Sequence, residues 1–171
     1  MKRFLSGILA GLLLSSVMVI LPRSQAATDD RLKLSAGSNL TLIQGNTYLT
    51  GICGTITADV LADNFDQNIT ITSPSGDTLK GGILVPSDTV VSNGTSSVKV
   101  LIYGDTDRDG TLSLSDVTEI LKYIANWNID ICEDAIDLNW DNKYDLSDVT
   151  LLLKKIAGWD VTFEMTPVVP A

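Results

Sequence analysis

The sequence predicts an α+β protein, with a small β-rich N-terminal domain followed by an all-α module. Short β-prone runs separated by turn residues fill positions 36–103. A stretch that starts at Gly104 then returns at Ile136 with a constant offset, and each copy leads into apolar residues at helical spacing. Two copies are too few for a solenoid, and suggest two units packed about a pseudo-twofold axis. The expected parts are a β-rich domain at 27–103, two loop–helix repeats at 104–160 and a tail at 161–171.

Residues 1–26 have the pattern of a secretory signal peptide. Lys2 and Arg3 form a basic start, an apolar run extends from Phe4 to Leu21, and small residues before Ala27 offer a cleavage site. The run is near the lower limit for crossing a bilayer, so an uncleaved membrane anchor stays open as an alternative. We expect a secreted, extracellular protein, attached to a membrane only through this segment if at all.

The β-rich part is expected to contain five short strands and one helix. Gly45-Asn46 is a hairpin-like turn signal between the first two strands. A short helix is expected from Thr57, as its N-cap, to Phe65, and a bent strand or loop around Gly81-Gly82. No Pro/Ser-rich linker follows this part, so the two parts are expected to pack together. The strands are expected at 40–43, 47–50, 68–72, 89–91 and 98–103.

Both copies of the repeat carry oxygen-bearing side chains at the spacing of an EF-hand loop. Such a loop binds calcium through its first, third, fifth, seventh, ninth and twelfth residues, the seventh through its backbone carbonyl. In the first copy these are Asp105, Asp107, Asp109, Thr111, Ser113 and Asp116, and in the second they are Asp137, Asn139, Asp141, Lys143, Asp145 and Asp148. Lys143 is compatible because only its carbonyl is needed. Ser113 and Asp145 are expected to act through a water.

Calcium is the cation that this set of ligands favours, because it is a hard ion that takes six to eight oxygens in flexible geometry. The chain contains no His, and Cys132 lies outside both loops, which excludes a zinc site with nitrogen and sulfur ligands. The sharp turn at the sixth residue is served by Gly110 and, in the second copy, by Asn142, the next most tolerant residue. Two Ca²⁺ ions per chain are expected.

Each loop runs into an amphipathic helix. Ser115 and Ser147 are the expected N-caps, each followed by an Asp that suits the positive end of the helix dipole. Gly158 is expected to end the second helix. Trp127 and Trp159 follow at matching places and are expected to pack the helix ends. The apolar stripes are Val117, Ile120, Leu121 and Ile124 in the first helix, and Val149, Leu152, Leu153 and Ile156 in the second.

Two departures from an ordinary EF-hand distinguish the repeat. The twelfth residue is Asp instead of the longer Glu, and a predicted strand precedes the first loop where an EF-hand has a helix. Paired loop–helix units of this kind resemble the type I dockerin, over roughly Tyr103 to Trp159. The resemblance implies a non-catalytic module that docks a secreted protein onto a cohesin of a scaffold or cell-surface protein, in cellulosome-type assemblies linked to polysaccharide degradation.

The resemblance also implies where a cohesin would bind. The leading contacts are the residue pairs at the tenth and eleventh loop positions. These pairs are identical in the two copies, so either helix face is expected to engage a cohesin, in two orientations. Helix capping and solvent exposure remain an alternative account of these residues. Trp140, inside the second loop, is expected to be exposed. The contact residues are Leu114, Ser115, Leu146 and Ser147, with Lys122, Lys154 and Lys155 at the rim.

Composition excludes several classes of function. The net charge is −9, and removal of Lys2, Arg3 and Arg23 with the signal peptide leaves −12, which argues against a nucleic-acid partner. The absence of His excludes Ser-His-Asp and Cys-His catalysis, and no Glu lies between residues 27 and 104. We therefore expect no enzyme. A carbohydrate-binding module, or a calcium-stabilised structural module without a cohesin partner, stays open.

The two cysteines, Cys53 and Cys132, fall one in each half of the mature chain. A disulfide between them would suit a secreted protein and would link the two halves. Two free buried thiols are an equal alternative.

Overall fold

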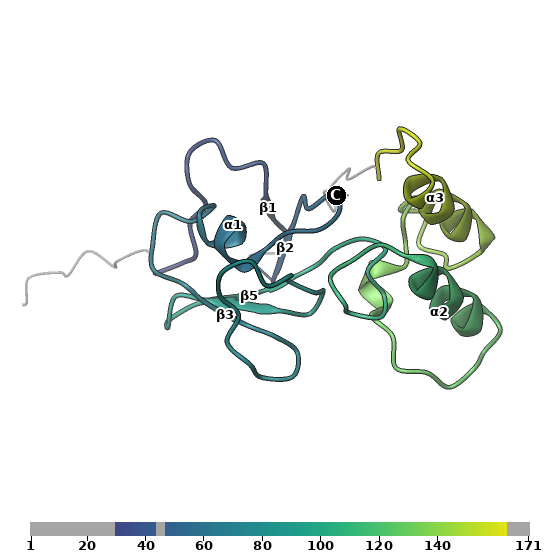
Figure 1. Ribbon diagram of the computed structural model, residues 1–171, viewed down its shortest axis with the longest axis horizontal. Helices are drawn as coiled ribbons and strands as arrows, with labels where there is room; N and C mark the ends of the chain where they lie inside the picture. The colour runs from purple at the N-terminus through teal and green to yellow at the C-terminus, as the bar shows by residue number, and fades with distance from the viewer. Residues whose placement is uncertain (1–29, 44–46, 164–171) are drawn as a thin grey trace, which may run out of the picture.

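The computed structural model describes residues 30–43 and 47–163. Within them a β-sheet from the first part of the chain is followed by helices, which confirms the predicted α+β class. The sheet and the two long helices lie at opposite ends of the molecule (Figure 1). The predicted signal peptide, the turn residues Gly45 and Asn46 and the last eight residues of the predicted tail lie outside the described residues.

The sheet has five strands in the order β1-β2-β5-β4-β3. β2 and β5 are parallel, while the other neighbouring pairs are antiparallel. β1 and β2 form the predicted hairpin, the strands predicted at 68–72 and 98–103 have shorter counterparts, and the one predicted at 89–91 is shifted by one residue. The bounds are Thr41–Ile43 for β1, Tyr48–Thr50 for β2, Thr70–Thr72 for β3, Val90–Ser92 for β4 and Ser97–Val100 for β5.

Helix α1 (Ala58–Ala62) packs on the sheet through Ala58 and Leu61, which are buried in the same apolar cluster as the inward residues of the strands. Thr57 occupies the predicted N-cap position, but its side chain makes no capping hydrogen bond. The loop before β4 supplies acceptors instead, because the backbone N–H of Ala58 donates to the carbonyl of Ile83. The helix thus begins where predicted, with its first N–H groups satisfied by a tertiary contact, but it ends at Ala62 instead of Phe65.

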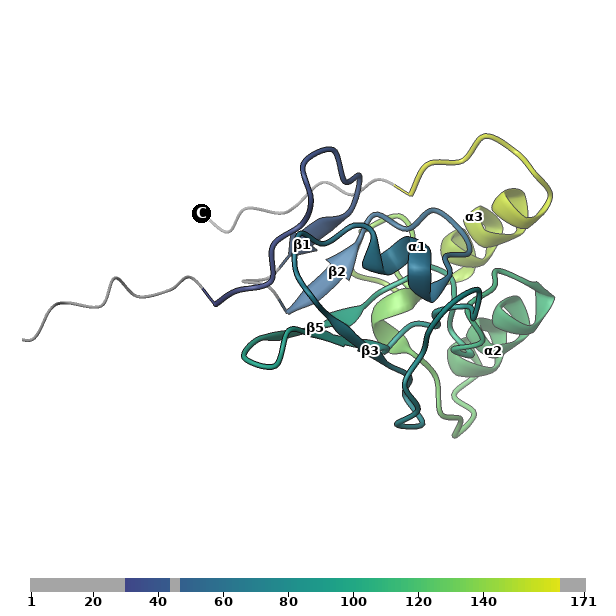
Figure 2. The same cartoon turned by 60° about the vertical axis from the view of Figure 1, so that its left-hand side comes forward.

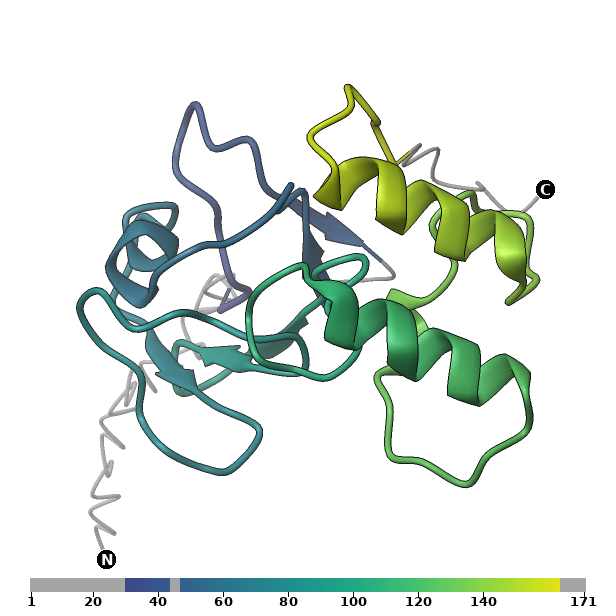
Figure 3. The ribbon, with the colours of Figure 1, turned by 45° about the vertical axis from the view of Figure 1, so that its right-hand side comes forward.

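The second part of the chain contains α2 (Leu114–Ile124), the 3₁₀ turn η1 (Glu133–Ala135) and α3 (Leu146–Ile156). α2 and α3 run side by side in opposite directions (Figure 3). Ile120 and Leu152, which occupy equivalent positions in the two copies of the repeat, are both fully buried between them. Of the apolar stripes predicted from the sequence, Val117, Ile120, Val149 and Leu152 are buried in this cluster, whereas Leu121 and Leu153 are 42 % and 41 % exposed.

The N-caps predicted at Ser115 and Ser147 are wrong by two residues. The N-caps are Ser113 and Asp145, whose side chains accept hydrogen bonds from the backbone N–H of Ser115 and Ser147. Each forms a capping box with the Asp three residues later. The helices start earlier because that Asp bonds back to the N–H of the N-cap residue, so the ninth loop residue is both a loop and a cap residue.

Both helices end in the same way. Asn126 and Gly158 have positive φ values of 58° and 79°. The N–H of the next residue, Trp127 or Trp159, donates to the carbonyl five residues earlier, as in a Schellman motif. The predicted stop at Gly158 is confirmed. The tryptophans stay 62 % and 63 % exposed, so the prediction that they pack the helix ends is wrong, apart from a contact of Trp159 with Lys154.

The extended segment that follows β5, residues 101–103, packs into the apolar clusters of both parts. Leu101 and Tyr103 are buried in the cluster beneath the helices, whereas Ile102 between them is buried in the cluster beneath the sheet. An extended chain places successive side chains on opposite faces, which explains this alternation. The Tyr48 hydroxyl also donates to Asp134 Oδ2, at 2.7 Å. The segment and its neighbours lie between sheet and helices in a second view (Figure 2).

Three further expectations concern single residues. Cys53 is exposed and Cys132 is buried, and both thiols are free, so the structure contains no disulfide between them. Trp140 is half-buried against Tyr103, with ring centroids 5.3 Å apart, instead of exposed. In the described part of the predicted tail, Phe163 packs into the cluster beneath the helices. None of the described helices has the length and apolar composition needed to span a membrane.

Candidate functional site

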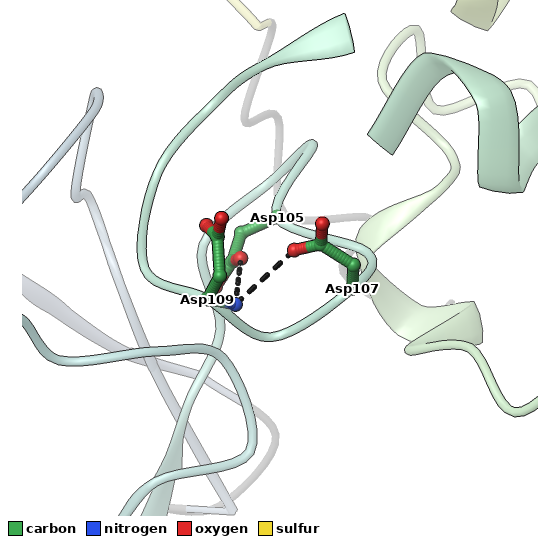
Figure 4. A group of neighbouring side chains, drawn as sticks. All are labelled: Asp105, Asp107 and Asp109. Carbon is green, nitrogen blue, oxygen red and sulfur yellow. Dashed lines mark hydrogen bonds between the residues drawn. The ribbon is translucent and has the colours of Figure 1, made fainter. Parts of the chain in front are cut away.

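The first predicted calcium loop brings three carboxylates together. Asp105, Asp107 and Asp109 each offer one carboxylate oxygen, and these oxygens lie within 4.8 Å of one another. The backbone N–H of Asp109 donates to Oδ1 of both Asp105 and Asp107, at 3.1 and 3.2 Å, which folds the loop around them (Figure 4). The first three predicted ligands of this loop therefore converge as the spacing predicts.

The twelfth residue closes the first loop. Asp116 is 0 % exposed. Its Oδ1 accepts hydrogen bonds from the backbone N–H groups of Thr106 and Asp107, and its Oδ2 accepts one from Ser113. Thr111 and Ser113, the seventh and ninth residues, lie on the same loop, and the N–H of Thr111 donates to Asp109 Oδ1 at 2.7 Å. The carboxylate of Asp116 thus links the start of the loop to the start of α2.

The second loop repeats these hydrogen bonds. The N–H of Asp141 donates to Oδ1 of Asp137 and of Asn139, and the N–H of Lys143 donates to Asp141 Oδ1. Asp148 is 0 % exposed, and its carboxylate accepts from the N–H groups of Leu138 and Asp145. The sequence repeat is therefore also a repeat of loop geometry.

The backbone of both loops turns at the same two places. The fourth residues, Arg108 and Trp140, have φ values of 62° and 61°, and the sixth residues, Gly110 and Asn142, have values of 81° and 60°. Positive φ was predicted at the sixth residue and is confirmed. It was not predicted at the fourth, where Arg and Trp have no intrinsic preference for it. The hydrogen bonds to the loop carboxylates compensate for this strain.

The electrostatics of the first loop favour a bound cation. Burial raises the pKa of Asp116 to about 6, although backbone hydrogen bonds from Ser113 and Asp107 oppose the shift. Burial also raises the pKa of Asp105. Desolvation destabilises a carboxylate that has no positive partner nearby, and a divalent cation supplies that partner. Convergent, partly buried oxygen ligands without nitrogen or sulfur fit calcium.

In the second loop the third ligand position carries the neutral amide of Asn139. The exposed residues Asp141, Asn142 and Lys143 form its tip. Asp145 occupies the ninth position, and hydrogen bonds from Ser147 lower its pKa. The second loop thus has the same fold as the first with one less negative charge at the third position and more contact with solvent.

The predicted docking residues lie on the outer faces of the helices. Leu114 and Leu146 are 63 % and 62 % exposed, although both side chains are apolar. Ser115 and Ser147 are exposed beside them, and the Ser115 hydroxyl donates to Asp107 Oδ2 at 2.6 Å. The serines are therefore tied to the loops as well as available at the surface.

The three predicted rim lysines are all half-buried. Lys122 lies in the last turn of α2. Lys154 lies over the ring of Trp159, with Nζ 5.8 Å from the ring centroid. Lys155 lies over the ring of Phe163 and donates to the carbonyl of Val161. Lys155 is thus engaged by the residues that follow α3 and is less available to a partner than Lys122.

Sequence reasoning missed the residues of the β-rich part that contact the first loop. The backbone N–H of Ser87 donates to Asp105 Oδ2 at 2.6 Å. Asp88 accepts a hydrogen bond from Arg108 Nε at 2.8 Å, and Arg108 also contacts Asp130. Asp88 also has a positive φ of 63°, and no pattern in the sequence predicts either this backbone conformation or the contact.

Comparison with known protein families agrees with this geometry. A family model of the dockerin type I domain matches residues 103–157, which span both loops and both long helices. No curated protein and no solved structure matches the chain. Dockerin type I domains are EF-hand-like modules that bind calcium and dock onto cohesin domains in cellulosomes. Residues 103–157 of this chain are therefore a type I dockerin domain, preceded by a small β-sheet.

Proposed function

We propose that this chain is a secreted, non-catalytic protein whose dockerin domain attaches the β-rich part to a cohesin on a scaffold or cell-surface protein. The proposed domains are a signal peptide at 1–26, a β-rich domain at 27–103, the dockerin domain at 104–160 and a tail at 161–171. The observation that carries the proposal is the recurrence of the same loop hydrogen bonds in both copies of the repeat, combined with an exposed Leu at the start of each helix.

Each loop would hold one calcium ion through the residues named from the sequence. Asp105, Asp107, Asp109 and Asp116 would supply carboxylate oxygens in the first loop, and Asp137, Asn139, Asp141 and Asp148 would supply side-chain oxygens in the second. Bound calcium would neutralise acids that repel one another in its absence, and would thereby stabilise the loops and the helices that start from them. The site then depends on calcium, and so does the docking face.

The docking face would lie at the start of either helix. Leu114 and Leu146 occupy equivalent positions, are equally exposed and follow loops of the same geometry. Burial of a Leu side chain contributes about 1.5–3 kcal/mol, which makes these residues the strongest apolar contacts available at the helix starts. Because the helices run in opposite directions, the two faces would present a cohesin with two orientations.

The experiment is a binding assay of the mature chain against a panel of type I cohesins, with calcium and with EDTA. We expect one cohesin to bind with calcium and to dissociate with EDTA. Leu114→Ala and Leu146→Ala should each halve the association constant, because the other face remains. The double variant should weaken binding at least about tenfold, or 1.4 kcal/mol. Val60→Ala, at a 54 % exposed position on α1, is the matched control and should bind like the wild type.

Failure of the chain to bind any cohesin in the panel would argue for the structural alternative, a calcium-stabilised module without this partner. If one single variant already abolishes binding, only one face serves. If the double variant binds normally, the contact assignment is wrong.

Carbohydrate binding is the second candidate, because an aromatic-lined pocket lies at the junction of the two parts. The pocket has a volume of about 180 Å³. Aromatic rings combined with a few polar groups are the usual composition of a small-ligand site. Retardation of the mature chain on a gel containing soluble polysaccharide, with loss of retardation on Tyr144→Ala, would favour this function. The aromatic lining residues are Tyr48, Tyr103, Trp140 and Tyr144, with Asp134 and Asn142 among the polar ones.

A further inference from the structure

The two calcium loops have the same internal geometry but different surroundings. Asp105, the first residue of the first loop, is 0 % exposed and accepts a hydrogen bond from the N–H of Ser87 in the β-rich part, at 2.6 Å. Its counterpart Asp137 is half-buried and accepts its hydrogen bonds from Asp141 and Asn142 of its own loop. A residue outside the repeat, Ser87, thus contacts the first loop at Asp105, its first predicted ligand.

Two further contacts join the residues around Ser87 to the first loop. The sixth residue, Gly110, is buried, and a Cβ added there would lie 3.1 Å from the carbonyl oxygen of Val85. The carboxylate of Asp88 accepts a hydrogen bond from Arg108 Nε at 2.8 Å and pairs with Lys99 Nζ at 3.0 Å. Residues 85–88 therefore contact the first, fourth and sixth residues of the loop.

Ser87 also fixes this segment to the chain that leads into the loop. Its hydroxyl donates to the carbonyl of Ile102, at 3.2 Å, and accepts from the N–H of the same residue, at 3.1 Å. Ser87 is 0 % exposed. The position of Asp105 relative to residues 85–88 is consequently set by three hydrogen bonds within a buried region.

We propose that residues 85–88 are a positioning element for the first calcium loop, which makes this loop the tighter of the two calcium sites and couples its occupancy to the stability of the β-rich part. The inference rests on the proposed function, which supplies the two sites. It differs from that function in assigning a role to residues outside the dockerin domain.

The physical reason is preorganisation. A free loop must order its backbone when it binds a cation, at a cost of about 1–2 kcal/mol for each residue fixed. Contacts that already hold three loop residues remove part of this cost, and the difference appears as affinity. The coupling is reciprocal, so calcium in the first loop must stabilise the residues that hold it.

The experiment follows the amide signals of Gly110 and Asn142 by nuclear magnetic resonance while calcium is added to the metal-free mature chain. These residues occupy the sixth position of each loop, so each signal reports on one site in the intact protein. We expect the Gly110 signal to saturate first, with an affinity at least about tenfold higher, which is 1.4 kcal/mol. Saturation of both signals together, or of Asn142 first, would overturn the proposal.

Reciprocal substitutions at the sixth position of the two loops distinguish the effect of the contact with Val85 from the effect of the loop sequence. Gly110→Asn places in the first loop the residue that the second loop already uses, so the left-handed backbone stays accessible. Its side chain must however displace the carbonyl of Val85. We expect this variant to lower the affinity of the first loop about tenfold, to that of the second. Asn142→Gly, at the exposed counterpart, should leave both affinities within about threefold of the wild type.

A second variant avoids any steric conflict. Asp88→Asn keeps the shape of the side chain and the tolerance of positive φ, but removes the charge that faces Arg108 and Lys99. We expect a three- to tenfold loss of affinity in the first loop and none in the second. Asp66→Asn removes the same charge at an exposed position that makes none of the contacts described above, and should change neither site. An equal loss of calcium affinity at both loops would mean that the change in net charge alone explains the effect, and would contradict the proposal.

The outcomes also separate this inference from the proposed function. If neither signal responds to millimolar calcium, the two-site proposal itself fails. If both respond with equal affinity and Gly110→Asn changes nothing, the calcium sites stand and only the positioning role is lost.

Discussion

Single residues decide how each loop of the repeat meets its helix. Asp116 and Asp148 are fully buried, and each accepts hydrogen bonds from a residue at the start of its loop and from the N-cap of its helix. A Glu at this place would have to fold back to make the same bonds, whereas the shorter Asp reaches both directly. The choice of Asp at the twelfth position thus joins metal loop and helix start in one side chain.

At the same scale, the two cysteines should differ in reactivity. Cys53 is exposed, whereas Cys132 is buried, and burial raises the pKa of its thiol to about 12. Because the thiolate is the reacting species, Cys132 should resist alkylation at pH 8. We expect mass spectrometry to find one modified cysteine, Cys53, in the folded calcium-loaded protein.

Both cysteines should be modified after unfolding in denaturant, which serves as the control. Modification of neither thiol in the unfolded, unreduced protein would mean that a disulfide had formed. Rapid modification of both in the folded protein would contradict the buried position of Cys132.

At the scale of elements, the two helices are copies that stabilise each other. Their capping boxes, their buried contact residues and their Schellman ends recur at equivalent positions of the repeat. The helices have eleven residues each, a length at which an isolated helix is marginal in water. Their stability must therefore come from the contact between them and from the loops that cap them.

Truncation of the buried contact should destabilise the dockerin domain in either helix. Ile120→Ala and Leu152→Ala remove fully buried side chains, and we expect each to lower the free energy of unfolding by about 2–5 kcal/mol. Leu121→Ala and Leu153→Ala change neighbouring residues that are 42 % and 41 % exposed, and should cost less than about 1 kcal/mol. Urea unfolding with calcium present measures all four. Equal losses in the free energy of unfolding for the buried and the exposed pair would contradict the assignment of Ile120 and Leu152 to the contact between the helices.

At the scale of the whole molecule, the apolar core of the β-rich part adjoins that of the dockerin domain. Leu112 packs against both apolar clusters, and residues 101–103 alternate between them. The hydrogen bonds of Ser87 and Tyr48 cross the same boundary. Disruption of one part therefore exposes apolar surface of the other, and the two should unfold as one unit.

Calcium removal tests this coupling. We expect a single thermal transition with calcium, and a lower Tm for the β-rich part after EDTA, because a ligand that binds only the folded state stabilises everything that unfolds with it. Near-ultraviolet circular dichroism, which reports on the packing of the aromatic side chains, and the far-ultraviolet helix signal should change together. Magnesium at the same concentration is the control for ionic strength. Two separate transitions, with the first independent of calcium, would contradict this coupling.

The local features of the fold could be predicted from the sequence because their causes are local. Strand and helix periodicity, the Gly110 turn and the spacing of Asp105, Asp107 and Asp109 depend on residues that are neighbours in the chain. Errors at this level were small: the one at Thr57 has a tertiary cause, and those at the two later N-caps have a local one. The cap at Thr57 is replaced by carbonyls of a distant loop, and the helix starts move to Ser113 and Asp145 because a buried Asp bonds back to them.

By itself the sequence determined the α+β class, the repeat and the buried helix positions, since each follows from periodicity, and it predicted calcium from the type of the ligands. Only the tertiary structure decided which of the two loops is contacted by residues of the β-rich part. Ser87 and Asp88 lie before β4, far from Asp105 in the chain, and act through a backbone N–H and a left-handed turn, neither of which leaves a side-chain pattern. It also decided that Trp140 is half-buried while Trp127 and Trp159 are exposed, because burial depends on what the rest of the chain brings to each ring.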